Sequence, residues 1–263
     1  MIRKHIFKDK AENSSVRWRL HEPTRLEAFS DAVFAFALTL VVISLEVPHQ
    51  FEELLMLMKG FFGFAFCFLF LMLIWHDQYT YFRRFGLQDT RTTFYNMVLL
   101  FMVIYLVYPL KFLFFYLSSG FSGQNMNSET VLRFQNQGEV CQLMIIYGIG
   151  YLTIYILMTL MYAHALKRKN DISLSPLEVY NTRTYMYTFM GRIGVVLLSI
   201  AIAIYGLNKE GLYAFLSGIS YSGIGLVMWG VNAKRSKKIK TLFSQTEIDE
   251  VMNEVVIVRE EKN

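Results

Sequence analysis

Polar side chains interrupt the apolar segment of residues 25–48, and this segment is the part of the chain best suited to chemistry. Ser30 and Asp31 stand near its start, Thr39 in its middle and Glu46 near its end. The segment is about long enough to cross a bilayer, which takes roughly 20 residues. Polar groups inside a membrane helix are unfavourable unless they pair or meet water. A helix that keeps them is therefore expected to line a passage rather than only to anchor the chain.

Helical spacing places one set of residues from this segment on a single stripe: Phe36, Thr39, Ile43 and Glu46. If several copies of the helix meet on this stripe, Phe36 and Ile43 would form hydrophobic constrictions that close by dewetting. The Thr39 hydroxyls would offer oxygen atoms to a partly dehydrated cation, and Glu46 would concentrate cations at the outer mouth. Ordinary helix packing explains the same stripe, with Thr39 bonded to its own backbone and Glu46 among the headgroups.

A second polar face of the same helix needs partners from other helices, because Asp31 lies roughly 140° around the helix from Phe36. Residues expected on the same side of the membrane can satisfy it in one network: Arg25, Ser30, Asp31, Trp75, His76 and Asn96. Trp75 and His76 come late in the second apolar span, and Asn96 begins the third. A belt of interfacial residues would explain Trp75 and His76 equally well.

The remaining polar motifs argue against enzymatic chemistry. Ser30, His76 and Asp31 can be combined on paper into a hydrolase triad, but Asp31 follows Ser30 directly and no nucleophile elbow is present. The sequence has no Walker A loop, zinc-protease motif or dinucleotide fingerprint. Cys67 and Cys141 fall inside apolar spans and are interpreted as small core residues. We expect no enzyme activity, no catalytic residue, no metal site and no cofactor.

Two further features lie within the apolar spans. Arg192 stands well inside the fifth span, where it can pair with a buried carboxylate or reach the inner interface, and we favour the interface. Residues 147–151, Tyr-Gly-Ile-Gly-Tyr, are superficially like a potassium-channel filter. They lie in mid-helix without a pore-loop context, so we interpret them as a helix-packing segment.

The composition is that of a polytopic membrane protein. Of 263 residues, 54% are hydrophobic and 18% are charged, whereas a soluble domain has about 25% charged residues. We predict an all-α membrane protein with six spans, at about 26–47, 51–82, 93–117, 140–166, 185–207 and 212–231. Residues 1–24 form an N-terminal segment, residues 25–232 the six-helix transmembrane domain, and residues 233–263 a C-terminal tail.

Lys and Arg are distributed unevenly between the connections, and this predicts the orientation. The first 25 residues and the tail carry seven each, and the loops after the second and fourth spans carry three and four. The loops after the first, third and fifth spans carry none, one and one. Cytoplasmic connections are rich in Lys and Arg, so both termini are expected in the cytoplasm. The net charge of +5 follows from this topology, and nucleic acid is not expected as a partner.

One polar helix among six spans is too little to enclose a pore in a single subunit, so we expect a closed symmetric assembly around it. The residues that open the first span resemble the hallmark Arg-x-x-x-Phe-Ser-Asp of the transmembrane protein 175 family, which comprises potassium channels of bacteria, archaea and animal endolysosomes: Arg25, Phe29, Ser30 and Asp31. Further positions are similar to bacterial members: Trp75 and His76, Asn96, Pro109, and Glu46 with Pro48. The resemblance covers the whole chain and is strongest over residues 22–112.

This resemblance implies a homotetramer in which the first helix of each subunit lines the pore and no pore-loop filter exists. It places the constriction at Phe36, a threonine layer that contributes to potassium preference at Thr39, and a second apolar ring at Ile43. The network that holds the pore helices would comprise Arg25, Ser30, Asp31, Trp75 and His76. Phe36 departs from the aliphatic residue typical of the constriction. Leu38 or Leu40 would face the axis instead if the helix were rotated.

We therefore expect a homotetrameric potassium channel of a bacterial inner membrane, with membrane lipids and permeant potassium ions as its further partners. Selectivity and gating would reside in the apolar constrictions and the Thr39 ring. Two alternatives stay open. One is a proton-coupled transporter or proton-leak channel that uses Asp31 and His76 as a relay, and the other is a structural membrane protein that conducts nothing.

Overall fold

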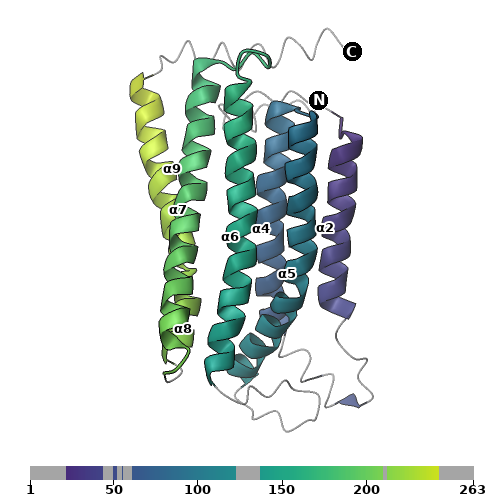
Figure 1. Cartoon of the computed structure of the whole chain (residues 1–263), viewed down its shortest axis with the longest axis vertical. Helices are drawn as coiled ribbons and strands as arrows, with labels where there is room; N and C mark the ends of the chain where they lie inside the picture. The colour runs from purple at the N-terminus through teal and green to yellow at the C-terminus, as the bar shows by residue number, and fades with distance from the viewer. Residues whose placement is uncertain are drawn as a thin grey trace.

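The computed structural model describes residues 22–43, 50–51, 55, 61–122, 137–209 and 212–242. These residues form helices joined by turns, without a strand among them: α2 (Arg25–Ile43), α4 (Phe61–Phe85), α5 (Thr90–Ser122), α6 (Gln137–Lys167), α7 (Pro176–Gly206), α8 (Leu212–Ser220) and α9 (Gly223–Leu242). The helices form one elongated bundle with α2 at one edge and α8 and α9 at the opposite edge (Figure 1).

The all-α membrane architecture predicted from the sequence is confirmed for the described part of the chain. The stretches long and apolar enough to cross a membrane are Thr90–Leu110, Gly138–Lys167, Pro176–Gly206 and Leu212–Arg235. Beside them stand α2, with 19 residues, and α4, with 25 residues. The first and second predicted spans also include residues 44–47, 52–54 and 56–60, which lie outside the described residues.

The fifth helix begins earlier than predicted. We expected it near residue 185 and placed Pro176 in a loop, but α7 starts at Pro176. Ser175 Oγ accepts a hydrogen bond from the Glu178 backbone N–H at 3.2 Å, and the Glu178 carboxylate accepts one from the Ser175 N–H at 3.0 Å. This capping box, with proline at the first helical position, starts the helix. Hydropathy missed it because the first turns of α7 are polar.

The sixth predicted span is two helices rather than one. Between α8 and α9, Tyr221 N–H donates to Gly218 O at 3.2 Å and Ser222 N–H to Ile219 O at 2.9 Å, so the backbone tightens into turns with bonds three residues apart. Serine and glycine are weak helix formers, which favours a break at this point. The second piece, α9, continues to Leu242 and so passes through residue 232, where we placed the end of the transmembrane domain.

The filter-like segment at residues 147–151 lies within α6 and packs against neighbouring helices. A Cβ atom at Gly148 would meet Ile200 Cγ1 of α7 at 2.7 Å, and one at Gly150 would meet Leu106 Cδ2 of α5 at 2.6 Å. Real side chains essentially never approach this closely, so a larger residue at either position would force the Ile200 or Leu106 side chain to move, whereas glycine lets the three helices pack as they do. The segment has the helix-packing role that we inferred from its mid-helix position.

The start of α2, the α4–α5 turn, the α6–α7 turn and the end of α9 lie at the same end of the bundle (Figure 1). We call it the basic end, because it carries most of the described Lys and Arg residues, among them Arg83, Arg84, Arg91, Lys167, Arg168, Lys169 and Arg183. The α7–α8 connection at the other end carries Lys209.

Candidate functional site

The helix that carries the predicted site, α2, is fixed at its start by a capping box. Thr24 Oγ1 accepts a hydrogen bond from the Glu27 N–H at 3.1 Å, and the Glu27 carboxylate accepts one from the Thr24 N–H at 3.3 Å. Glu27 is buried and also pairs with Arg83 of α4, with 3.0 Å between Glu27 Oε1 and Arg83 Nε. One carboxylate therefore starts α2 and ties it to its neighbour α4.

One turn further along α2, a chain of buried hydrogen bonds joins three helices. The Ser30 hydroxyl accepts from Asn96 Nδ2 of α5 at 2.9 Å, and Asn96 Oδ1 accepts from Gln78 Nε2 of α4 at 2.8 Å. Ser30 also donates to Leu26 O of its own helix at 2.8 Å. All three side chains of the chain are fully buried. Sequence reasoning included Ser30 and Asn96 but missed Gln78, although a glutamine one turn after Trp75 in an apolar helix was a signal.

Asp31 has its own partner on α4. Trp75 Nε1 donates to Asp31 Oδ1 at 2.7 Å, and the indole stacks on Tyr79 with 5.3 Å between ring centroids. Asp31 and Trp75 are both half-buried. The hydrogen bond satisfies the carboxylate within the bundle and holds α2 against α4 one residue beyond Ser30.

The structure does not bring Arg25 and His76 into this network. Both side chains are exposed, and neither has a hydrogen bond or ion pair with another described residue. His76 follows Trp75 directly, so it lies about 100° further around α4. The Trp75 indole, rather than the imidazole, reaches Asp31. Asp31 and His76 thus have no described contact of the kind that a proton relay between them would use.

The part of the predicted pore stripe that the structure describes, Phe36 and Thr39, lies on the uncovered side of α2. Phe36 is 56% exposed, and Thr39 is also exposed. The Thr39 hydroxyl donates to Phe36 O at 2.7 Å, which is the backbone bond considered in the packing alternative. Leu38 and Leu40 are half-buried and pack against the core, so neither is as open as Phe36. The helix α2 ends at Ile43. The Ile43 side chain and the whole of Glu46 lie outside the described residues.

A second buried polar group lies on the opposite side of α4 and was not expected. Arg192 of α7 forms a buried ion pair with Asp77 of α4. Arg192 Nη1 also donates to the Tyr155 hydroxyl of α6 at 2.6 Å, and that hydroxyl donates to Asp77 Oδ2 at 2.9 Å. We favoured the inner interface for Arg192, and this expectation was wrong. The carboxylate lies deep in the bundle, within reach of the long guanidinium side chain.

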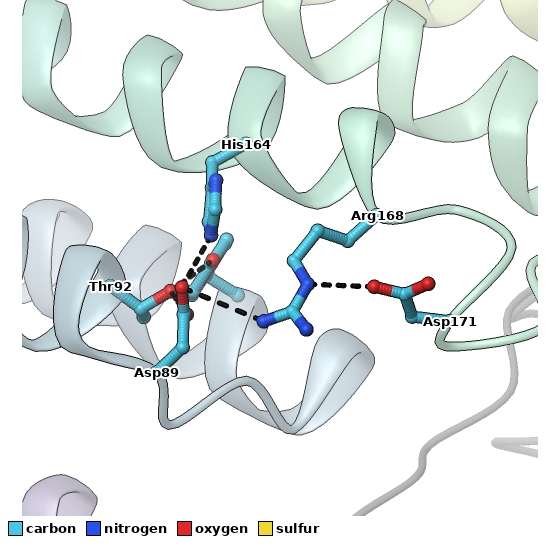
Figure 2. A network of polar contacts seen from close by, with 6 residues as sticks. Asp89, Thr92, His164, Arg168 and Asp171 are labelled. Atoms are coloured by element: carbon cyan, nitrogen blue, oxygen red, sulfur yellow. Dashed lines mark hydrogen bonds and ion pairs between the residues drawn. The ribbon is translucent and has the colours of Figure 1, made fainter.

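A solvated cluster of charges closes the basic end (Figure 2). Asp89, in the α4–α5 turn, receives a hydrogen bond from Thr92 Oγ1 at 2.6 Å and lies 2.7 Å from His164 Nε2 of α6. Arg168 Nη1 is 3.7 Å from the same carboxylate, and Arg168 Nε donates to Asp171 at 2.9 Å. Burial raises the pKa of Asp89, but these hydrogen bonds and positive charges outweigh it, so its pKa lies below the ordinary value.

Metal-binding chemistry finds no support in the part of the chain that is described. No three His, Cys, Asp or Glu side chains gather closely enough there to hold a metal ion. Cys67 and Cys141 are free and buried. The arrangement built around α2 is one that holds a helix in place while leaving its apolar and hydroxyl-bearing stripe open.

Comparison with known proteins gives consistent results. A family described as "Endosomal/lysosomal potassium channel TMEM175" matches residues 25–106. The chain is 35% identical over 233 residues to a "Potassium channel" of Marivirga tractuosa, covering 86% of this chain and 94% of that protein. It is 33% identical over 104 residues to a potassium channel of Chamaesiphon minutus, covering 36% of this chain and 51% of that protein.

Solved structures show the same similarity. The crystal structure of the potassium channel MtTMEM175, a threonine-to-alanine variant bound to a nanobody fusion protein, matches with a TM-score of 0.72 and 33% identity over 86% of this chain and 98% of that one. A Chamaesiphon minutus homologue of the lysosomal potassium-selective channel TMEM175 matches with a TM-score of 0.51 over 79% of this chain and 97% of that one. Its identity of 21% makes this second likeness one of fold alone.

Proposed function

Since this chain belongs to the TMEM175 family, we propose that it forms a homotetrameric potassium channel in which α2 of each subunit lines a shared pore. The observation that carries the proposal is the two-sidedness of α2. Glu27 and Ser30 are buried against α4 and α5, whereas Phe36 and Thr39 are exposed on the outside of the subunit. An exposed hydroxyl in a membrane helix is expected to face water or another subunit rather than lipid. The relatives found are channels, in line with a protein that is not an enzyme.

Thr39 is the candidate for potassium preference. Its hydroxyl proton is directed to Phe36 O, which leaves the lone pairs of Oγ1 free to point elsewhere. Four such oxygens around an axis would replace part of the water shell of a potassium ion. Such a site favours the cation with the lower dehydration penalty, which is potassium rather than sodium. No cofactor takes part, and the permeant ion is the ligand.

Phe36 and Ile43 are the candidates for the gate, and Glu46 for the outer vestibule. A ring of apolar side chains narrow enough to expel water blocks ions until the helices move apart. Phe36 is larger than an aliphatic residue and presents a ring face that attracts cations. A carboxylate ring at Glu46 would raise the local concentration of cations at the mouth.

The basic end is proposed to face the cytoplasm of a bacterial cell, which puts both termini on that side. Seven of the described Lys and Arg residues in the α4–α5 and α6–α7 regions support this orientation: Arg83, Arg84, Arg91, Lys167, Arg168, Lys169 and Arg183. The α7–α8 connection at the opposite end has Lys209. This asymmetry follows the positive-inside rule.

Potassium and sodium flux into liposomes that contain the purified protein tests the proposal. We expect potassium flux to exceed sodium flux, and Thr39→Ala to lower this ratio about three- to tenfold, as for a lost polar contact of about 0.7–1.4 kcal/mol. Thr153→Ala is the matched control, because Thr153 on α6 makes the same kind of bond, donating to Ile149 O at 2.8 Å. Equal ratios in both variants and the wild type would contradict a threonine-ring filter.

Two further readouts separate this proposal from its alternatives. Phe36→Ala should widen the constriction and raise conductance, and native mass spectrometry should find tetramers. A current that follows the proton gradient and vanishes in Asp31→Asn would replace the potassium channel with a proton pathway. Absence of any flux from folded tetramers in both assays would leave a structural protein.

A further inference from the structure

The helix α4 stands between the proposed pore helix and the outer part of the subunit, and it carries polar side chains on two sides. Trp75 and Gln78, about 60° apart around the helix, contact α2 and α5. Asp77 lies about 160° from Trp75 and contacts α6 and α7. The segment of four residues 75–78 therefore joins the two parts of the subunit.

The outward connection of α4 is made by long side chains rather than by close backbone packing. α4 packs closely along α5 and α2 but has only sparse contact with α6. Two turns after Asp77, on the same stripe, Arg84 Nη2 donates to the Tyr185 hydroxyl of α7 at 2.8 Å, and its guanidinium lies 4.1 Å from the Tyr185 ring centroid. Asp77 and Arg84 thus both connect α4 to α7.

The partner of Asp77 is held from several directions. Asp77 is 7% exposed and Arg192 is 2% exposed. Besides Asp77 and Tyr155, Arg192 donates to Met228 Sδ of α9 at 3.1 Å. Its guanidinium carbon lies 4.8 Å from the Tyr155 ring centroid and 5.7 Å from that of Phe189. Because Arg192 is held by contacts on three helices, Asp77 can pair with it in only one position.

We propose that Asp77 and Arg192 are positioning residues of the pore. Their buried ion pair fixes the rotation of α4 about its axis. In turn, α4 sets the rotation of α2 through Trp75, which donates to Asp31, and through Gln78, which reaches Ser30 by way of Asn96 of α5. This inference rests on the proposed function, because it concerns which face of α2 meets the ion. A charge pair suits this role, since a rotation of α4 that parts the two groups leaves both charges in a low-dielectric interior. A slightly rotated apolar contact has no comparable penalty.

The test measures the ratio of potassium to sodium permeability, from reversal potentials of purified tetramers in planar bilayers. The first variant, Asp77→Leu with Arg192→Met, removes both charges together, which buried ion pairs often tolerate. We expect it to assemble as a tetramer with a permeability ratio changed roughly three- to thirtyfold, which lies within the range of coupling between neighbouring groups. A wild-type ratio and wild-type conductance in this tetramer would overturn the proposal.

A double-mutant cycle shows whether the pair acts through α4. Trp75→Phe, which loses the bond to Asp31, is combined with the charge-free pair. If both changes act on the rotation of α2, their effects on the permeability ratio are not additive. Additive effects would overturn the proposal, because a pair that only stabilises the fold has no reason to couple to Trp75.

Two further variants keep the result interpretable. Ser199→Ala removes a buried contact between α7 and α8, in which Ser199 Oγ lies 2.9 Å from Ser217 Oγ, and should lower the unfolding temperature without moving the permeability ratio. If the charge-free pair does not assemble, Arg192→Lys is measured instead. A smaller shift in the same permeability ratio supports the proposal, and an unchanged ratio overturns it. A wild-type protein without potassium flux would instead refute the proposed function itself.

Discussion

On one face of α4, Trp75 and Gln78 reach α2 and α5 through hydrogen bonds, whereas on the other face Asp77 meets Arg192 as a buried ion pair. Trp75 and Gln78 meet mostly neutral partners, and the one carboxylate that they contact, Asp31, is only half-buried. Further along α4, Arg83 also pairs with the buried Glu27 of α2. The second face places two opposite charges almost out of reach of solvent. Hydrogen bonds on the first face can be lost singly with modest effect, but the two charges on the second must be kept or removed together.

The largest effect is expected where one charge of the buried pair is removed alone. Asp77→Asn or Arg192→Met should lower the free energy of unfolding by roughly 3–5 kcal/mol, because the remaining charge stays buried without its partner. Removing both charges should recover most of this loss. Thermal unfolding of the detergent-solubilised protein, followed by tryptophan fluorescence, measures it. A double variant no more stable than either single variant would remove the distinction between the two faces.

An intermediate effect is expected at the centre of the hydrogen-bonded face. Asn96→Ala leaves both the Ser30 hydroxyl and the Gln78 amide without this partner in a buried position, at a loss of about 1–3 kcal/mol. Gln142→Ala serves as the control, since Gln142 is an exposed amide on α6. The same unfolding measurement applies. If Asn96→Ala lowered the free energy of unfolding as much as Asp77→Asn does, burial rather than charge would determine the size of these effects.

The smallest effect is expected at the solvated cluster of the basic end, which tests whether charge alone matters. The pKa of Asp89 is below its ordinary value of 3.8. A carboxylate of this kind stabilises the folded chain above its ordinary pKa and loses that contribution as the pH falls through the lowered value. Asp89→Asn should therefore unfold at a lower temperature than wild type at about pH 6, with the difference shrinking towards about pH 3. A difference in unfolding temperature between Asp89→Asn and wild type that stays constant with pH would contradict this prediction.

Local features of the chain could be predicted because they depend on neighbours in sequence. The capping box at Thr24 and Glu27 follows the local pattern Thr-x-x-Glu, and the apolar spans gave the helices. The same rule would have found the start of α7 at Ser175, Pro176 and Glu178, where attention to hydropathy led us to place a loop. The break between α8 and α9 was missed because small residues favour close packing and helix ends alike.

The network around α2 shows where prediction from sequence stopped. Ser30, Asp31, Trp75 and Asn96 were expected on one membrane side, and the structure gives their pairing: Ser30 with Asn96, and Asp31 with Trp75. His76 was a reasonable partner by membrane depth, but depth does not say which way a side chain faces. The roles of Phe36, Thr39, Ile43 and Glu46 in conduction stay predictions.

The sequence by itself determined that the chain is a helical membrane protein, where most helices lie, and which motif opens the first of them. These properties follow from hydropathy, charge and capping, which act over a few neighbouring residues. Only the tertiary structure decided that Asp77 meets Arg192, 115 residues further along the chain, and that Gln78 completes the Ser30 chain. In a bilayer both lipid and protein interior are apolar, so hydropathy does not distinguish the faces of a helix. Its rotation is set by the few polar partners that other helices bring within reach.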